Sequence, residues 1–132
     1  MAGWQIYDYV DGEGTNQFET WSNGLERKYR AMLNRKLKAL EDETEHGLIP
    51  GLVVGPIRGY PHIYKLQIGG KVKLRPLLCK GPIDPNNELT LLIGATERDW
   101  KFDPKNAPET AEKRRQEIIR DSRRRCNHVK VL

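Results

Sequence analysis

Basic side chains of the types that handle phosphate gather between residues 62 and 75. Lys65, Lys73 and Arg75 lie in two segments that alternate like strands, and His62 precedes the first of them. Arginine is always charged and presents a planar fork suited to phosphate, whereas histidine exchanges a proton near neutral pH. For any one of them, the alternative is a solvated side chain. The candidate catalytic residues are Arg75, His62, Lys65 and Lys73.

Positive charge is concentrated in the second part of the chain. Of the 132 residues, 31% are charged, and the net charge is +5. Residues 1–50 hold six Lys and Arg against nine Asp and Glu, whereas residues 51–132 hold seventeen against nine. This asymmetry indicates that the second part faces a polyanion, and nucleic acid is the first partner to consider. A solvated charged surface is the other interpretation.

Further candidates for RNA contact lie in a loop-like segment, 97–102, and in a basic C-terminal helix. An exposed Trp100 between cations is suited to stacking on a base. The basic runs 113–115 and 123–125 suit phosphate contacts, although cations at a helix C-terminus also complement the helix dipole. The candidate RNA-binding residues are Arg98, Trp100, Lys101, Arg114, Arg115, Arg123 and Arg124.

Several classes of protein are disfavoured by the composition. The two cysteines, Cys79 and Cys126, do not have zinc-ligand spacing, so we expect no metal, no cofactor and a reducing compartment. No apolar run approaches the roughly 20 residues of a membrane helix, and residues 1–5 do not resemble a signal peptide. The sequence predicts a cytoplasmic protein with no membrane partner.

The first elements are a strand and two helices. The aromatic and β-branched segment 4–10 predicts a strand, after which Thr15 or Asn16 can cap a short helix that Gly24 interrupts. A second helix is predicted over 26–43, because four apolar residues line one of its faces. These residues are Tyr29, Leu33, Leu37 and Leu40.

Beyond Gly47, which should end the helices, the pattern changes to strands. Segment 62–68 alternates, Gly69-Gly70 predicts a two-residue hairpin turn, and segment 71–79 returns. The apolar run 88–95 predicts a buried central strand. Three consecutive strands joined by short turns would form an antiparallel meander.

The turn at Gly69-Gly70 would set which side chains share a face. A two-residue turn places Tyr64 opposite Arg75 and Leu66 opposite Lys73. A slip of one residue would exchange the two faces, and Pro76 suggests a bulge. The sequence therefore leaves open which face of the sheet forms a cleft.

A last helix is predicted over 108–125, docked by Ala107, Ala111 and Ile118. The order is then β-α-α-β-β-β-α, and the prediction is an α+β fold in a single domain, 1–132. It contains an antiparallel sheet of about four strands, a helical hairpin on one face, and a C-terminal helix.

Four features carry a resemblance: this element order, the Leu-rich helix at 33–41, the strand pair 64–67 and 73–76, and the strand, loop and helix start over 91–109. In these features the chain resembles the RelE/HigB/ParE superfamily of bacterial toxins, and most closely its phage-derived RelE-like branch. Three features differ from the family pattern, and one of them is Gly94-Ala95 in place of glycine followed by an aromatic residue. Glu97-Arg98 replaces a Lys-Lys pair, and Gln67 replaces an arginine.

The resemblance implies a toxin of a type II toxin–antitoxin system that cleaves mRNA at the ribosome without a metal. A base would activate the ribose 2′-hydroxyl, cations would stabilise the phosphorane, and an acid would protonate the leaving oxygen. Arg75 matches the family arginine that touches the scissile phosphate. The implied partners are mRNA, the ribosome and a small helix-turn-helix antitoxin.

Two alternatives stay open. One is a ParE-like inhibitor of DNA gyrase. The other is a non-toxic phage-derived adaptor that binds nucleic acid or protein. The sequence does not decide the target codon, the oligomeric state, or whether Glu97-Arg98 is compatible with catalysis.

Overall fold

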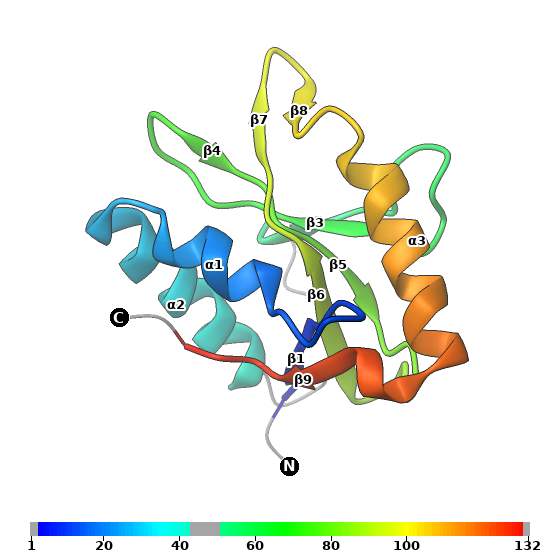
Figure 1. Ribbon diagram of the computed structural model, residues 1–132. Helices are drawn as coiled ribbons and strands as arrows, with labels where there is room; N and C mark the ends of the chain where they lie inside the picture. Colours follow the sequence, from blue (N-terminus) through cyan, green and yellow to red (C-terminus); the bar gives the residue numbers. More distant parts are fainter. Residues whose placement is uncertain (1–2, 43–50, 131–132) are drawn as a thin grey trace.

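A computed structural model describes residues 3–42 and 51–130, which form three layers. Helices α1 (Gln17–Asn23) and α2 (Arg27–Glu41) lie on one side of a mixed six-stranded sheet, and α3 (Ala107–Arg120) lies on the other (Figure 1). The strands in sheet order are β2 (Val53–Val54), β3 (Tyr64–Leu66), β5 (Leu77–Lys80), β6 (Glu88–Ile93), β1 (Gln5–Tyr9) and β9 (Arg125–Asn127).

The α+β class is confirmed, but the sheet is larger than the predicted four strands and is not wholly antiparallel. β1 runs parallel to β6, with Ile6 opposite Leu89. The remaining pairs are antiparallel, including the predicted meander β3-β5-β6. Among the described residues, no helix combines the length and the apolar character needed to cross a membrane.

β6 is the predicted central strand, and it is apolar because both of its faces are covered. Leu89 and Leu91 pack in one core with α2, whereas Leu92 packs in a second core with α3. Side chains alternate between the faces of a strand, so a sheet covered on both sides needs apolar residues at successive positions.

The helical hairpin forms as predicted. The Asn16 side chain accepts a hydrogen bond from the Glu19 amide and caps α1, which ends at Gly24. In α2, the four predicted apolar residues are all buried. Gly47, predicted to end this region, lies outside the described residues.

One glycine in the sheet is required by the packing of α1. A Cβ atom built on Gly94, just after β6, would lie 2.0 Å from the Trp21 ring. The indole therefore packs directly against the strand backbone, and a larger residue at position 94 would displace α1.

α3 is shorter than predicted. Its apolar stripe of Ala107, Ala111 and Ile118 is fully buried, but the helix ends at Arg120 and not at Arg125. Asp121 adopts an extended conformation and accepts a hydrogen bond from the Arg123 amide, which starts the 3₁₀ turn η1 (Ser122–Arg124).

After η1 the chain enters the sheet as β9, which pairs with β1. Arg125 pairs with Glu88 at 2.8 Å and stacks on the Tyr7 ring. His128 Nδ1 lies 2.8 Å from Oδ1 of the fully buried Asp8. These contacts fix the edge strand, so this histidine has a structural partner.

The predicted two-residue turn at Gly69-Gly70 is wrong. Ile68 bridges to Leu74 and Tyr64 lies opposite Leu78, so the connection spans residues 69–73 and the register differs by three from the prediction. Tyr29 on α2 explains the wider loop, because its hydroxyl accepts a hydrogen bond from the Val72 amide.

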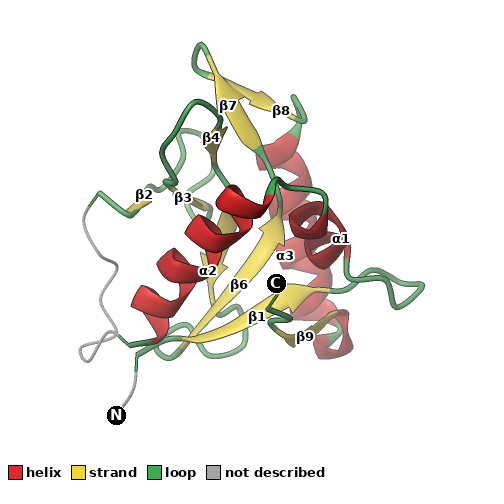
Figure 2. Ribbon diagram, turned by 90° about the vertical axis from the view of Figure 1, so that its left-hand side faces the viewer, coloured by secondary structure: helices red, strands yellow, loops and turns green. Residues whose placement is uncertain are grey.

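A second, three-stranded sheet projects from one end of the molecule (Figure 2). Its strands in order are β4 (Lys73–Leu74), β7 (Thr96–Arg98) and β8 (Lys101–Asp103). Segment 97–102, predicted as a loop, is therefore a tight hairpin. Its two turn residues, Asp99 and Trp100, both have positive φ, at 51° and 66°, as a type I′ turn requires.

Candidate functional site

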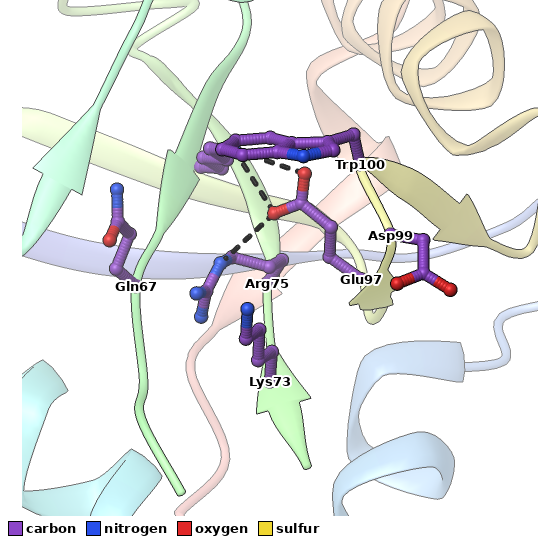
Figure 3. A pocket seen from close by; sticks show the side chains of 7 residues that line it. Gln67, Lys73, Arg75, Glu97, Asp99 and Trp100 are labelled. Carbon is purple, nitrogen blue, oxygen red and sulfur yellow. Dashed lines mark hydrogen bonds and ion pairs between the residues drawn. The ribbon is translucent and has the colours of Figure 1, made fainter. Parts of the chain in front are cut away.

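A cavity of about 350 Å³ lies between the ends of β3 and the projecting sheet. It is lined by Lys65, Gln67, Lys73, Arg75, Glu97, Asp99 and Trp100. Figure 3 shows these side chains around the carboxylate of Glu97. The structure thus brings together three of the four candidate catalytic residues: Lys65, Lys73 and Arg75. We call this the Lys65 cavity.

Glu97 is the centre of the cavity's charge network. Its carboxylate accepts hydrogen bonds from Lys65 Nζ at 3.1 and 3.3 Å and from Arg75 Nε at 3.2 Å. The three side chains are only 18%, 11% and 10% exposed, in the order Lys65, Arg75, Glu97. An ion pair that is screened so little by water is stronger than one on the open surface.

Arg75 is held by the backbone as well as by Glu97. Its Nη1 donates to the carbonyl oxygens of Ile68 at 3.0 Å and Leu74 at 2.7 Å. Both carbonyls flank the loop 69–73, which replaces the predicted tight turn. The guanidinium therefore has a fixed orientation, and its Nη2 has no hydrogen bond among the described residues.

The two lysines of the cavity differ in their surroundings. Lys65 is half-buried, and its Nζ lies 5.8 Å from the centre of the Phe102 ring. Lys73 is exposed, and within the described parts of the chain it makes no ion pair. Lys73 is opposite Glu97 in the register of β4 and β7, which brings both to the same cavity.

Trp100 forms the outer wall of the cavity. In Figure 3 its indole lies over the carboxylate of Glu97, while Asp99 points away from Arg75. Trp100 is 92% exposed. Its backbone is in the left-handed conformation, which residues other than glycine adopt at a cost. Core packing does not account for a large aromatic ring at this position.

His62 does not reach the Lys65 cavity. It lines a separate cavity with Tyr64, Lys80 and Arg115. His62 lies in the turn that precedes β3 and not in the strand itself, so proximity in sequence to Lys65 did not bring it to the same site.

The candidate RNA-binding residues divide into two groups. Arg98 and Lys101 are exposed on the same hairpin as Trp100. The basic residues of α3 and η1 instead make intramolecular contacts. Arg114 donates to the Leu92 carbonyl and stacks on the Tyr9 ring.

The remaining three arginines of that group pair with carboxylates. Arg115 bonds Glu112 at 2.8 Å. Arg123 bonds Asp121 at 3.0 Å, and Arg124 lies 3.9 Å from the same carboxylate. Part of the basic surface predicted for nucleic acid is therefore engaged within the protein.

Glu97 is the functional candidate that the sequence did not single out. It appeared only as a departure from a Lys-Lys pair. A carboxylate directly opposite Lys73 would have been the signal, but the pairing of β4 with β7 joins segments that are separated in the chain by the two strands β5 and β6.

Within the described parts of the chain, the cysteines and acidic groups form neither a reactive thiol site nor a metal site. Burial raises the pKa of the Cys79 thiol to about 12, which disfavours the reactive thiolate. Burial also raises the pKa of Cys126. Among the described residues, no group of three or more His, Cys, Asp or Glu is arranged to hold a metal ion.

Comparisons of the chain with protein-family models, with curated proteins and with solved structures find no match in any of the three.

Proposed function

We propose that the protein is a metal-independent endoribonuclease of the RelE/HigB type, with the Lys65 cavity as its active site. One observation carries the proposal. Two lysines, an arginine and a carboxylate that is only 10% exposed converge on one cavity that an almost fully exposed tryptophan borders. Cleavage of RNA by its own 2′-hydroxyl needs a base, cationic stabilisation of the phosphorane and a means of holding the strand.

The residues suit these roles as follows. Glu97 accepts the proton of the 2′-hydroxyl as the 2′-oxygen bonds to phosphorus, and the Lys73 ammonium gives a proton to the 5′-oxygen that leaves. Lys73, which has no ion pair in the described residues, and the Nη2 group of Arg75 bind the phosphate oxygens, and Trp100 stacks on a base. Lys65 keeps the Glu97 carboxylate in place through its ion pair.

The proposal also includes a cellular location and a protein partner. An endoribonuclease that acts on translated mRNA works in the cytoplasm, and a toxic one needs an inhibitor. We therefore expect a small helix-turn-helix antitoxin as its partner.

One observation favours a second function, a non-catalytic adaptor on the same surface. Glu97 takes up hydrogen bonds from both Lys65 and Arg75, so it also competes with a phosphate for these cations. An adaptor would bind RNA or protein through Trp100 and the hairpin without cleavage.

Induced expression in a bacterium, with growth followed and mRNA 5′ ends mapped, tests the proposal. The endoribonuclease predicts growth arrest and new 5′ ends within translated regions. The adaptor predicts neither.

A further inference from the structure

A second cavity, of about 310 Å³, opens where β3 begins and β5 ends. His62, Lys80 and Arg115 supply its polar lining, and Tyr64 and three prolines complete the wall. We call it the Lys80 cavity. None of the described residues that line it is acidic, whereas two carboxylates line the Lys65 cavity. An anion therefore meets less opposing charge here.

Arg115 is held in place for such a role. Its Nε and Nη2 donate to the two oxygens of Glu112 at 2.8 and 3.0 Å, and its side chain is 12% exposed. Glu112 lies outside the lining, and Nη1 of Arg115 has no hydrogen bond among the described residues. A guanidinium fixed on one edge can present its other edge to a ligand at little entropic cost.

The other two basic groups are accessible. Lys80 and His62 are both exposed, and Lys80 Nζ lies 5.7 Å from the centre of the Tyr64 ring. The hydrogen bond from Arg115 is the main cause that lowers the pKa of Glu112, and the charge of His62 acts in the same direction. His62 and Arg115 line the same cavity, so the imidazole lies on the side of Arg115 that faces the cavity.

The wall of the cavity is preformed. The loop that follows β5 is fixed by Asp84, whose carboxylate accepts hydrogen bonds from the Asn86 amide and the Asn87 side chain. Proline restricts the backbone further. A preformed wall lowers the conformational entropy that binding would otherwise cost.

We propose that the Lys80 cavity binds a phosphate group, with Lys80 and Arg115 as its charge partners and His62 as a third donor. Hydrogen bonds between cationic side chains and phosphate oxygens are among the strong ones in proteins. The phosphate comes from a free anion or from the backbone of an RNA strand, and the chemistry is the same. The site does not depend on cleavage at the Lys65 cavity.

Titration of the full chain with inorganic phosphate at constant ionic strength, followed by NMR at the His62 ring, tests this site. Lys80→Gln should weaken phosphate binding by roughly tenfold, as expected for one charged hydrogen bond. Lys36→Gln is the matched control, because Lys36 is exposed on α2 and its substitution changes the net charge by the same amount. The dissociation constant of Lys36→Gln for phosphate should equal that of the parent protein.

A short oligouridylate added as competitor distinguishes the two sources. Displacement of phosphate from His62 by the oligonucleotide assigns the site to RNA, and phosphate binding without displacement assigns it to a free anion. Absence of any phosphate-dependent shift at His62 overturns the proposal, as does equal affinity in Lys80→Gln and Lys36→Gln. Neither result bears on RNA cleavage, which is measured separately.

Discussion

Glu97 determines the charge of the Lys65 cavity, because its carboxylate joins Lys65 and Arg75. A carboxylate between two cations neutralises part of their attraction for phosphate, yet the same pairs hold it in the orientation that a general base needs. These two effects act on different quantities, RNA affinity and cleavage rate, so they can be separated by experiment.

Glu97→Gln should raise RNA affinity and lower the cleavage rate. The amide keeps the size of the side chain but loses the charge that competes with phosphate and the ability to accept a proton. Removal of a general base lowers rates by about 10²–10⁴-fold. Binding and cleavage of one RNA substrate, measured on the same preparation, check this.

Asp99→Asn is the matched control for Glu97→Gln, since it removes the same charge from an exposed residue of the same cavity. It should cleave like the parent. If Glu97→Gln also cleaves like the parent, Glu97 is not the base.

Arg75→Ala should lower both activity and stability. Loss of a cation at the phosphorane removes roughly 2–4 kcal/mol of transition-state stabilisation, or about two to three orders of magnitude in rate. The Ile68 and Leu74 carbonyls each keep the amide of the other residue as a donor, but they lose a hydrogen bond from a charged group, so we expect a loss of roughly 1–3 kcal/mol of folding free energy.

Thermal unfolding and cleavage measured on the same Arg75→Ala protein separate these effects. Arg35→Ala, at an exposed residue of α2 that does not line the cavity, should change neither the unfolding temperature nor the cleavage rate. A folded Arg75→Ala variant with the parent's rate would limit Arg75 to a structural role.

At the scale of elements, the β7–β8 hairpin builds the site by placing Trp100 at its tip and Glu97 beside β4. Both turn residues have positive φ; aspartate is common at the first of these positions, but the second favours glycine and is Trp100 here. The turn therefore keeps a residue that its own backbone disfavours, which points to a role for the indole outside folding.

Trp100→Gly should leave stability unchanged or slightly higher while RNA affinity falls. Glycine adopts positive φ without strain, and loss of base stacking costs about 1–3 kcal/mol of binding free energy. Urea unfolding and RNA titration measure the two quantities. Trp100→Phe, which keeps an aromatic face, should restore most of the affinity; if Trp100→Gly binds as well as the parent, the ring does not stack.

Periodicity predicted the elements whose packing is local and repetitive. The face of α2 with Leu33 and Leu37, the docking stripe of α3 and the buried strand β6 all follow from spacing along the chain. Their side chains meet a single large surface, so the pattern is visible in the sequence.

The elements that were missed depend on contacts between distant segments. The two glycines at 69–70 indicated a tight turn, but the hydrogen bond from Val72 to Tyr29 on α2 holds a longer loop. The turn at Asp99–Trp100 has tryptophan where glycine is usual. The edge strand β9 is held by the ion pair between Arg125 and Glu88. The three cations of the Lys65 cavity were predicted individually, whereas Glu97 required knowledge of the β4–β7 pairing.

At the scale of the whole molecule, the positive charge of the second part is divided between internal pairs and the two cavities. Arg114, Arg115, Arg123 and Arg124 all have intramolecular partners. The net charge of the chain therefore overstates the charge available to RNA, and the cavities and the hairpin supply most of what remains.

RNA affinity should fall with salt, but with a modest slope. Displacement of counterions from single-stranded RNA gives a slope of about −0.7 in log K against log salt for each phosphate contact. Two contacts, one from Lys73 and one from Arg75, predict a slope of about −1.4. Titrations at several salt concentrations measure it, and an affinity that stays flat would indicate a partner other than a polyanion.

The mapping of mRNA 5′ ends after induced expression tests the central claim most directly, with the parent compared with Glu97→Gln and Asp99→Asn at equal levels of folded protein. The account predicts new 5′ ends inside translated regions for the parent and for Asp99→Asn, and their loss in Glu97→Gln. No new ends from the folded parent, or the same ends from Glu97→Gln, would contradict it.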